Sequence, residues 1–281
     1  DIGDFMHAKR FGYERDSKTF LEYHLSAEKA GEILNNTNGY YWRNRWFKPK
    51  HKEEVKVYYS TRGELRTYIH QIPEDASGES LTQSNALNAA QFFLVGTMGI
   101  DIQNWELIES KTEKLKNRWD HEFEWKERSF NIKESNHILT VKVQGDQIGY
   151  YNERIKLPET WRLEYEKIRS KNDLLSTIGF TGLFIALITI FIMILVRARE
   201  RDIQWKTAFT WSGIISVLLI INVFNNYPLE LYSYYTQDSY VAYLINIILF
   251  QCILLPLLVA LSLGILIAGS EPFYRDQYPH Q

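Results

Sequence analysis

The sequence predicts a water-soluble α+β domain with antiparallel strands, followed by three transmembrane α-helices. The first 172 residues mix charged, polar and apolar side chains as soluble domains do. Three later runs, residues 174–196, 207–224 and 241–268, contain no charged residue. Because a helix needs roughly 18 or more apolar residues to cross a bilayer, each run predicts a membrane span.

Composition narrows the possible functions. The chain has 281 residues and a formal charge of -2, whereas a nucleic-acid-binding protein is normally basic. Its one cysteine, Cys252, lies in the third apolar run, so no disulfide within the chain and no thiolate zinc site is expected. Because the chain begins at Asp1 without a signal sequence, we interpret it as part of a longer protein. Residues 269–281 are then the start of a downstream region.

The three apolar runs differ in length. The first has 23 residues, the second has 18 and is a minimal span, and the third has 28 and should tilt. Pro256 can kink the third helix because proline donates no backbone hydrogen bond. Buried helices of a large soluble protein are the alternative, but the runs have no polar face to present to water.

Basic residues near the spans predict their orientation. The connection 225–240 carries neither Lys nor Arg, whereas the connection 197–206 carries Arg197, Arg199, Arg201 and Lys206. We therefore expect the 197–206 loop in the cytoplasm and residues 1–172 on the extracytoplasmic side. The first span is ambiguous on its own, because it is preceded by Arg162, Lys167, Arg169 and Lys171. The contrast between the two loops decides the orientation.

Tyrosines crowd the second connection: Tyr227, Tyr232, Tyr234, Tyr235 and Tyr240. Amphipathic rings favour the membrane–water interface, so these residues predict an aromatic belt. Recognition of a partner is the alternative interpretation. The second span is expected to end at Asn225, Asn226 and Pro228.

The soluble part shows the same order of elements twice, a helix and then strands. In the first half, residues 1–75, a helix is expected over 26–35, where alanines and Leu34 share one face. Apolar positions alternate over residues 55–69, and a turn at Gly63 divides them, which predicts a hairpin.

The second half, residues 76–157, repeats this order. Residues 80–83 fit a capping box, and the next helix has Ala86, Ala90 and Phe93 on one face. Strands are expected near residues 103–110, 118–128, 137–144 and 147–157. The two halves also end on similar segments, 71–75 and 156–160. The sequence therefore predicts an internal repeat that packs helices on an antiparallel sheet.

A long helix is expected to connect the soluble domain to the membrane. Pro158 is suited to the first helical position, and nothing after it breaks the helix before residue 196. Residues 158–173 form its juxtamembrane part, with Trp161, Tyr165 and Ile168 on one stripe. The helix is either a plain tether or a lever that couples the domain to the membrane helices.

The search for catalytic, cofactor-binding and metal-binding residues is negative. His121 and Glu122 begin like a zinc-protease motif, but Trp125 occupies the position of the second histidine. We find no nucleophile elbow, phosphate loop or dinucleotide fingerprint, and no histidine spacing typical of a metal site. Polar residues within the spans are expected to face other helices, the main ones being Asn222, Asn246, Gln251 and Ser262.

Several short motifs, taken in order, resemble the extracytoplasmic region of large bacterial membrane proteases of the CPBP family, the CAAX-type intramembrane proteases. The soluble part supplies residues 52–58, 62–65, 72–75, 117–125, 143–146 and 169–172. The membrane part supplies residues 225–228 and 269–275. The soluble repeats also resemble PepSY-type modules, which are associated with peptidase regulation.

This resemblance implies that the catalytic core lies downstream of residue 281. That core uses paired glutamates, an arginine four residues after the second of them, and histidines on membrane helices, and it can hold a metal ion. Glu53 and Glu54 form a pair here, but Tyr58 stands at the arginine position. Phe20 and His24 match a Phe-x-x-x-His pattern by chance. No catalytic residue or cofactor site is therefore expected within this chain.

The leading functional hypothesis is a non-catalytic sensing, regulatory or substrate-recognition region of such a protease, located in the bacterial inner membrane. Its expected partners are the lipid bilayer, the downstream protease core and a peptide or protein substrate at the outer domain, but no nucleic acid. One alternative is a membrane-anchored peptide-binding or sensor protein without enzymatic activity, which should offer a groove or an exposed sheet edge. A scaffold subunit of a stable complex is the third interpretation.

Overall fold

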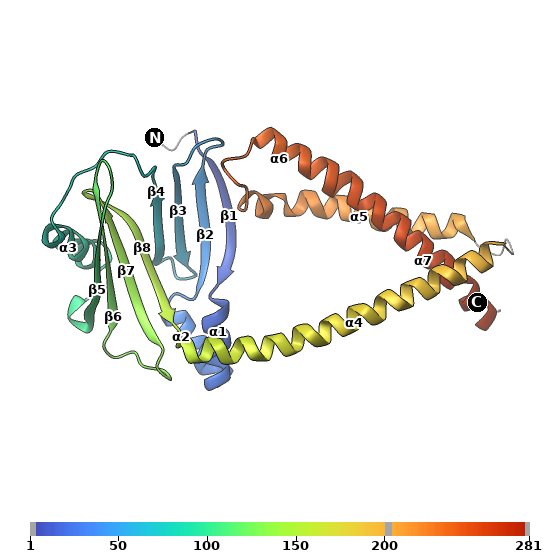
Figure 1. The fold of residues 1–281 in the computed structure, drawn as a ribbon, viewed down its shortest axis with the longest axis horizontal. Helices are drawn as coiled ribbons and strands as arrows, with labels where there is room; N and C mark the ends of the chain where they lie inside the picture. Colours follow the sequence, from blue (N-terminus) through green and yellow to red (C-terminus); the bar gives the residue numbers. More distant parts are fainter. Residues whose placement is uncertain (1–3, 200–203, 279–281) are drawn as a thin grey trace. The chain divides into compact units, whose positions relative to one another are not determined.

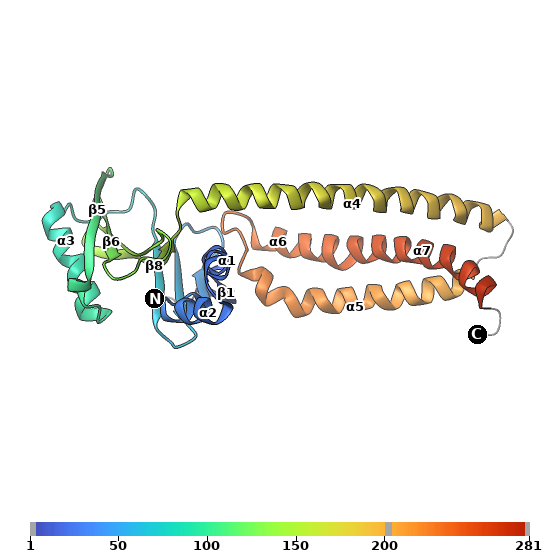
Figure 2. The same cartoon turned by 90° about the horizontal axis from the view of Figure 1, so that it is seen from below.

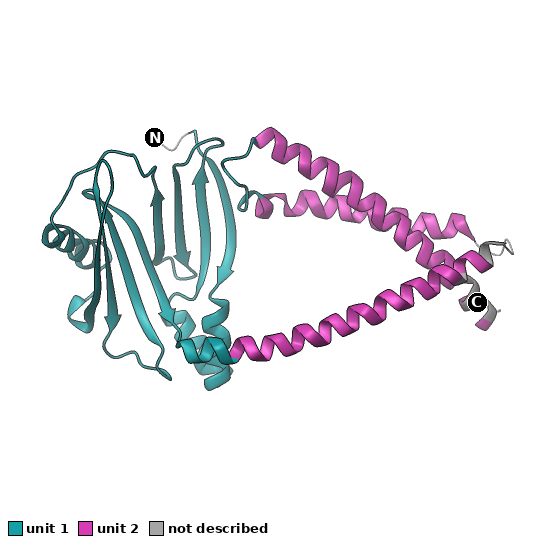
Figure 3. Cartoon of the chain, in the orientation of Figure 1, with its two compact units in different colours: residues 1–164, 231–239 teal, residues 165–230, 240–281 magenta. Residues whose placement is uncertain are grey.

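The computed structural model describes residues 4–199 and 204–278 and divides the chain into two compact units. The first unit, called the sheet domain below, comprises Asp1–Glu164 together with Leu231–Ser239. The second, called the helical unit, comprises Tyr165–Glu230 and Tyr240–Gln281 (Figure 3). Four residues of the predicted cytoplasmic connection 197–206, namely 200–203 with Arg201 among them, lie outside the described residues.

The sheet domain is built on one eight-stranded antiparallel sheet in the order β1-β2-β3-β4-β8-β7-β6-β5 (Figure 1). The first four strands are β1 (Met6–Tyr13), β2 (Tyr40–Phe47), β3 (Glu54–Ser60) and β4 (Leu65–Gln71). The last four are β5 (Trp105–Lys114), β6 (Trp119–Glu127), β7 (Asn136–Gln144) and β8 (Gln147–Lys156). The predicted hairpin is confirmed as β3–β4, with Gly63 at φ +88° in the turn, and the four predicted later strands are confirmed as β5–β8.

Each half of the sequence supplies four consecutive strands, and the last strands of the halves, β4 and β8, pair at the centre. The helices break the expected order. The first half places two helices, α1 (Arg15–His24) and α2 (Ala27–Asn36), between β1 and β2, whereas α3 (Gln83–Phe92) precedes all strands of the second half. The α+β class is confirmed, and the PepSY-type repeat stays a prediction.

The caps explain where the helices begin. Ser26 caps α2 by accepting the backbone N–H of Lys29, which confirms the predicted first helix within one residue. The predicted capping box at residues 80–83 is wrong. Thr82 caps α3 instead, accepting the N–H of Asn85, and the Leu81 carbonyl before it lies 2.9 Å from a ring nitrogen of the buried His121.

The hydrophobic core of the domain lies between α3 and the second half of the sheet. Ala86 and Ala90 of α3 and Leu94 of the following π-helical turn η1 (Phe93–Thr97) are fully buried. They cover Phe123, Trp125, Leu139, Val141, Val143 and Tyr151. The small alanines allow the helix to approach the sheet closely, and Phe93 packs against the cluster as expected.

The long helix is confirmed as α4 (Glu159–Arg199), one unbroken helix of 41 residues. Its first turn belongs to the sheet domain, where the N–H of Arg162 donates to the Pro158 carbonyl. Trp161 is buried there against Phe20, Tyr23 and His24 of α1. These aromatic contacts fix the start of α4 on the sheet domain and give Phe20 and His24 a packing role.

Three helical segments are long and apolar enough to cross a membrane: Glu159–Val196, Trp205–Leu231 and Tyr240–Glu271. The second is α5 (Trp205–Leu231), and the third joins α6 (Tyr240–Asn246), the π-helix η3 (Ile247–Leu254) and α7 (Leu255–Gln277). The three predicted spans are therefore confirmed by length and composition. The expected end of the second helix near Pro228 is wrong, because α5 continues through Pro228 to Leu231.

Small residues bring α5 and α7 together in the helical unit. Ser216 donates a hydrogen bond of 2.9 Å to the Pro256 carbonyl, and a side chain at Gly264 would clash with Phe209 and Ser212. Figure 2 shows the two helices running alongside each other. Pro256 cannot donate to the carbonyl four residues earlier, and the chain before it adopts the wider turns of η3.

We predict that Leu94→Ala lowers the free energy of unfolding of the sheet domain by about 2–5 kcal/mol, because it opens a cavity in a closely packed core. Leu107→Ala is the matched control, since Leu107 is 40% exposed and its truncation should cost less than about 1 kcal/mol. Urea unfolding of the detergent-solubilised chain, followed by tryptophan fluorescence, measures both. Equal losses would show that the α3 core does not stabilise the domain.

Candidate functional site

A groove of about 940 Å³ lies on one face of β2 and β3 in the sheet domain. The strands contribute Arg43, Arg45, Glu54, Lys56 and Tyr58. Two other segments form its remaining walls, residues 71–75 after β4 and residues 232–237, which lie between α5 and α6. We call it the β2–β3 groove.

The register of the sheet aligns the groove residues. Arg43 lies opposite Tyr58, Arg45 opposite Lys56, and Phe47 opposite Glu54. Side chains two residues apart point to the same face of a strand, so alternate positions of β2 and β3 line one surface. Sequence alternation identified the hairpin β3–β4, but it did not identify β2 or the chain segment that closes the groove.

Arg45 is the buried centre of this wall. Its side chain contacts Glu54 at 2.8 Å through Nε and 2.6 Å through Nη2, and both residues are buried. Its Nη1 donates to the carbonyls of Tyr232 and Tyr234 at 2.8 and 2.7 Å. The planar guanidinium suits this arrangement because its donors point in fixed directions. One arginine therefore binds β3 and the 231–239 segment at once.

The charge of Glu54 is balanced within the wall. Burial would raise the pKa of this carboxyl, but hydrogen bonds from Lys56 and Arg45 outweigh burial and hold the pKa below its usual range. Lys56 approaches the carboxylate to 2.5 Å. Glu54 is therefore a structural anion, with both its neighbouring cations engaged, and not a general base.

Aromatic rings complete the attachment of the 231–239 segment. Tyr234 is buried against Phe47 with ring centroids 5.6 Å apart, and the hydroxyls of Tyr232 and Tyr58 lie 3.0 Å apart. The backbone N–H of Lys50 donates to the Thr236 carbonyl. Tyr232 and Tyr234 thus pack on the sheet, and the interfacial aromatic belt expected of the tyrosines in this connection stays a prediction.

The groove also presents charged side chains that the wall does not use. Lys52 lies just before β3, and Glu74 and Asp75 lie just after β4. In the part of the chain that the structure describes, none of the three forms an ion pair. A cleft with charges of both signs and a tyrosine can hold a polar, extended ligand.

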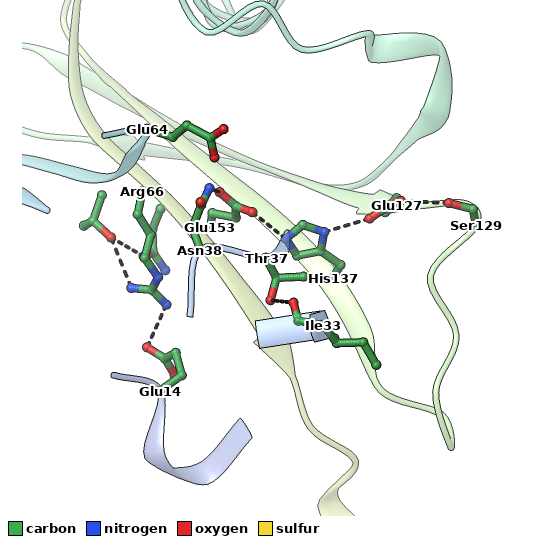
Figure 4. Close-up of polar contacts among 12 residues, drawn as sticks. Glu14, Ile33, Thr37, Asn38, Glu64, Arg66, Glu127, Ser129, His137 and Glu153 are labelled. Atoms are coloured by element: carbon green, nitrogen blue, oxygen red, sulfur yellow. Dashed lines mark hydrogen bonds and ion pairs between the residues drawn. The ribbon is translucent and has the colours of Figure 1, made fainter. Parts of the chain in front are cut away.

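A second polar cluster connects the two halves of the domain around His137 (Figure 4). Its Nδ1 lies 2.7 Å from Glu127 and its Nε2 lies 2.9 Å from Glu153. Asn38, in the turn after α2, donates to Glu153 at 2.9 Å and accepts from Arg62. The network therefore runs from the first half of the sequence into β8, β7 and β6.

Burial alone would lower the pKa of His137, but the hydrogen bonds and charges of Glu127 and Glu153 raise it to about 9. The bond to His137 in turn lowers the pKa of Glu127 despite the partial burial of that carboxyl. A cavity of about 590 Å³, lined by Trp105, Leu139 and Tyr151 among others, borders the cluster. Each acid of the His137 cluster is partnered, so we assign the cluster a stabilising role.

The residues singled out in the sequence prove to be structural. His121 is fully buried, with one ring nitrogen 3.0 Å from Thr112 and the other 2.9 Å from the Leu81 carbonyl. It shares a buried face with Phe123 and Trp125, as predicted. Glu53 lies 2.8 Å from His70, away from Glu54 and its cations. Within residues 4–199 and 204–278, no group of acids, histidines or cysteine could hold a metal ion.

Comparisons with known proteins do not identify the chain. No protein-family model, curated protein or solved structure matches it.

We predict that the stability of the sheet domain falls as pH rises through about 9. A histidine that is more basic when folded stabilises fully below its unfolded pKa of roughly 6.5, and that contribution, on the order of 3 kcal/mol, is lost by the time pH exceeds the folded value. His137→Gln, which does not titrate, should be less stable at neutral pH and should lack this part of the pH dependence. Urea midpoints between roughly pH 6 and pH 10 test it. Parallel curves for both proteins would contradict it.

We predict that Arg45→Gln releases the 231–239 segment, because the buried Glu54 and two carbonyls lose their charged donor. Hydrogen exchange of peptides covering residues 231–239 should become at least about tenfold faster. Arg154→Gln is the matched control, since Arg154 pairs with Glu124 on the other half of the sheet. Unchanged exchange in the Arg45 variant would mean that the aromatic contacts alone hold the segment.

Proposed function

We propose that this chain is a membrane-anchored recognition region, whose β2–β3 groove binds an extended segment of a peptide or protein. The observation that carries the proposal is the composition of the groove. Its walls come from the sheet and from the segment that joins two candidate spans, so a bound ligand touches both. Ligand binding at this groove can therefore act on the membrane helices through the 231–239 segment, without a catalytic step.

The groove is favoured over the free edges of the sheet. Both outer strands, β1 and β5, have one unpaired edge that could accept a peptide strand. Five of the ten residues of β5 are charged, and β1 carries Lys9 and Arg10. Charged side chains on edge strands discourage pairing with another chain. A cleft with unused charges of both signs offers more specific contacts.

Ligand binding in this groove could regulate an intramembrane protease or select its substrate. We propose that the chain is the non-catalytic sensing, regulatory or substrate-recognition region of a CAAX-type protease in the bacterial inner membrane, with residues 1–172 extracytoplasmic. The ordered motifs of the sequence support this, and the structural roles of Glu53, Glu54 and His121 agree with a region that has no catalysis of its own.

A sensor without enzymatic activity is the second candidate. It uses the same groove and the same membrane anchor, so the groove favours both equally. The gene downstream of residue 281 distinguishes the two candidates. A downstream membrane helix with Glu-Glu-x-x-x-Arg and neighbouring histidines would support the protease, and a stop codon soon after Gln281 would leave the sensor.

We predict that peptides selected against the full chain in nanodiscs bind less tightly when the groove loses its unused charges. Lys52→Ala with Glu74→Ala should weaken binding about tenfold or more, because charged hydrogen bonds in a cleft each contribute on the order of 1.5–3 kcal/mol. Lys116→Ala, an exposed lysine in the β5–β6 turn, is the control and should change nothing. Peptide arrays select the ligands, and fluorescence anisotropy measures Kd. Binding that survives the double substitution would place recognition elsewhere.

A further inference from the structure

The helical unit contains a notch of about 220 Å³ between α5 and η3. Its polar lining consists of Asn222, Asn226, Gln251 and, one residue before α5 ends, Glu230. Leu219, Val223 and Leu255 form its apolar lining. Amide side chains and an aliphatic surface therefore share one small opening within segments apolar enough to span a membrane.

The amide groups in the notch are only partly hydrogen-bonded. Asn226 donates to the backbone carbonyl of Asn222 at 3.0 Å and to its side-chain oxygen at 2.8 Å. Among the described residues, the amide nitrogen of Asn222, which is exposed, and the amide of Gln251, which is half-buried, form no hydrogen bond. Gln251 lies in the π-helical turn of η3, and such turns frequently occur at functional positions.

Lipid is a poor occupant of this notch. Acyl chains offer no donor or acceptor, so an amide that faces them keeps the full cost of desolvation. Elsewhere in the same unit the problem is solved by a neighbouring helix, where Ser216 donates to the Pro256 carbonyl. Most residues of the three candidate spans are exposed, so another helix could pack against them.

An amide is its own best complement, because it carries both donors and an acceptor. Two copies related by a two-fold axis would place Asn222 and Gln251 of each opposite the same residues of the other, as isologous interfaces require. We propose that this notch is a self-association site, at which a second copy of the chain seats its own amides within the membrane. The proposal does not depend on the β2–β3 groove or its ligand.

Cysteine cross-linking of the full chain in its native membrane tests this proposal. The chain has one cysteine, so the Cys252→Ser variant has no thiol and any cross-link must come from an introduced cysteine. Leu219→Cys in that background places a thiol in the notch, and mild oxidation should give a dimer of twice the chain mass. Adding Asn222→Leu and Gln251→Leu should reduce the dimer yield about tenfold, because two interhelical hydrogen bonds are lost.

Two controls separate the site from random collision and from misfolding. Ile185→Cys, on an exposed position of α4, should give no dimer, and Gln251→Asn, which keeps an amide, should retain most of it. Leucine is well tolerated in a membrane helix, so the two leucine variants should insert into the membrane as the unsubstituted chain does. The proposal is overturned if Leu219→Cys gives no dimer, if the leucines leave the yield unchanged, or if the adduct contains a different protein.

Discussion

The sheet domain depends on one buried cation. Arg45 satisfies Glu54 with two donors and two carbonyls of the 231–239 segment with a third, and no other residue type has donors in that geometry. A buried charge is tolerated only when it is paired and hydrogen-bonded, so each partner requires the others. This one side chain joins β2 and β3 to a segment almost 190 residues away, and the aromatic contacts of Tyr232 and Tyr234 add to that attachment.

A second buried network of paired charges joins the two halves of the sheet domain. The imidazole of His137 lies between two carboxylates, and Asn38 extends the network into the first half of the sequence. Only three residue pairs join β4 to β8, so the pairing between these two strands is short for a sheet of this size. The polar network therefore adds specificity where the strand pairing is limited, and its strength depends on the protonation of one ring.

The fold was largely predictable because its signals are local. Alternation over residues 55–69 and 137–157 specifies strands, and uncharged runs specify the spans. The β2–β3 groove was not predictable, because Arg45 and Tyr234 show no pattern that relates them. Their contact depends on the sheet register and on chain topology, both of which are non-local. The tyrosines of residues 225–240 illustrate the limit, since the same rings suit an interface and a protein surface equally well.

The place of the 231–239 segment constrains the topology of the whole chain. The segment and residues 4–164 belong to one compact unit, and in the sequence two candidate spans separate them. A chain that crosses a bilayer twice returns to the side it left, so one side holds both parts whichever orientation applies. The Lys and Arg contrast between the two connections predicts that this side is the exterior. On the proposed orientation the groove faces the exterior, and its 231–239 wall is continuous in the chain with the ends of α5 and α6.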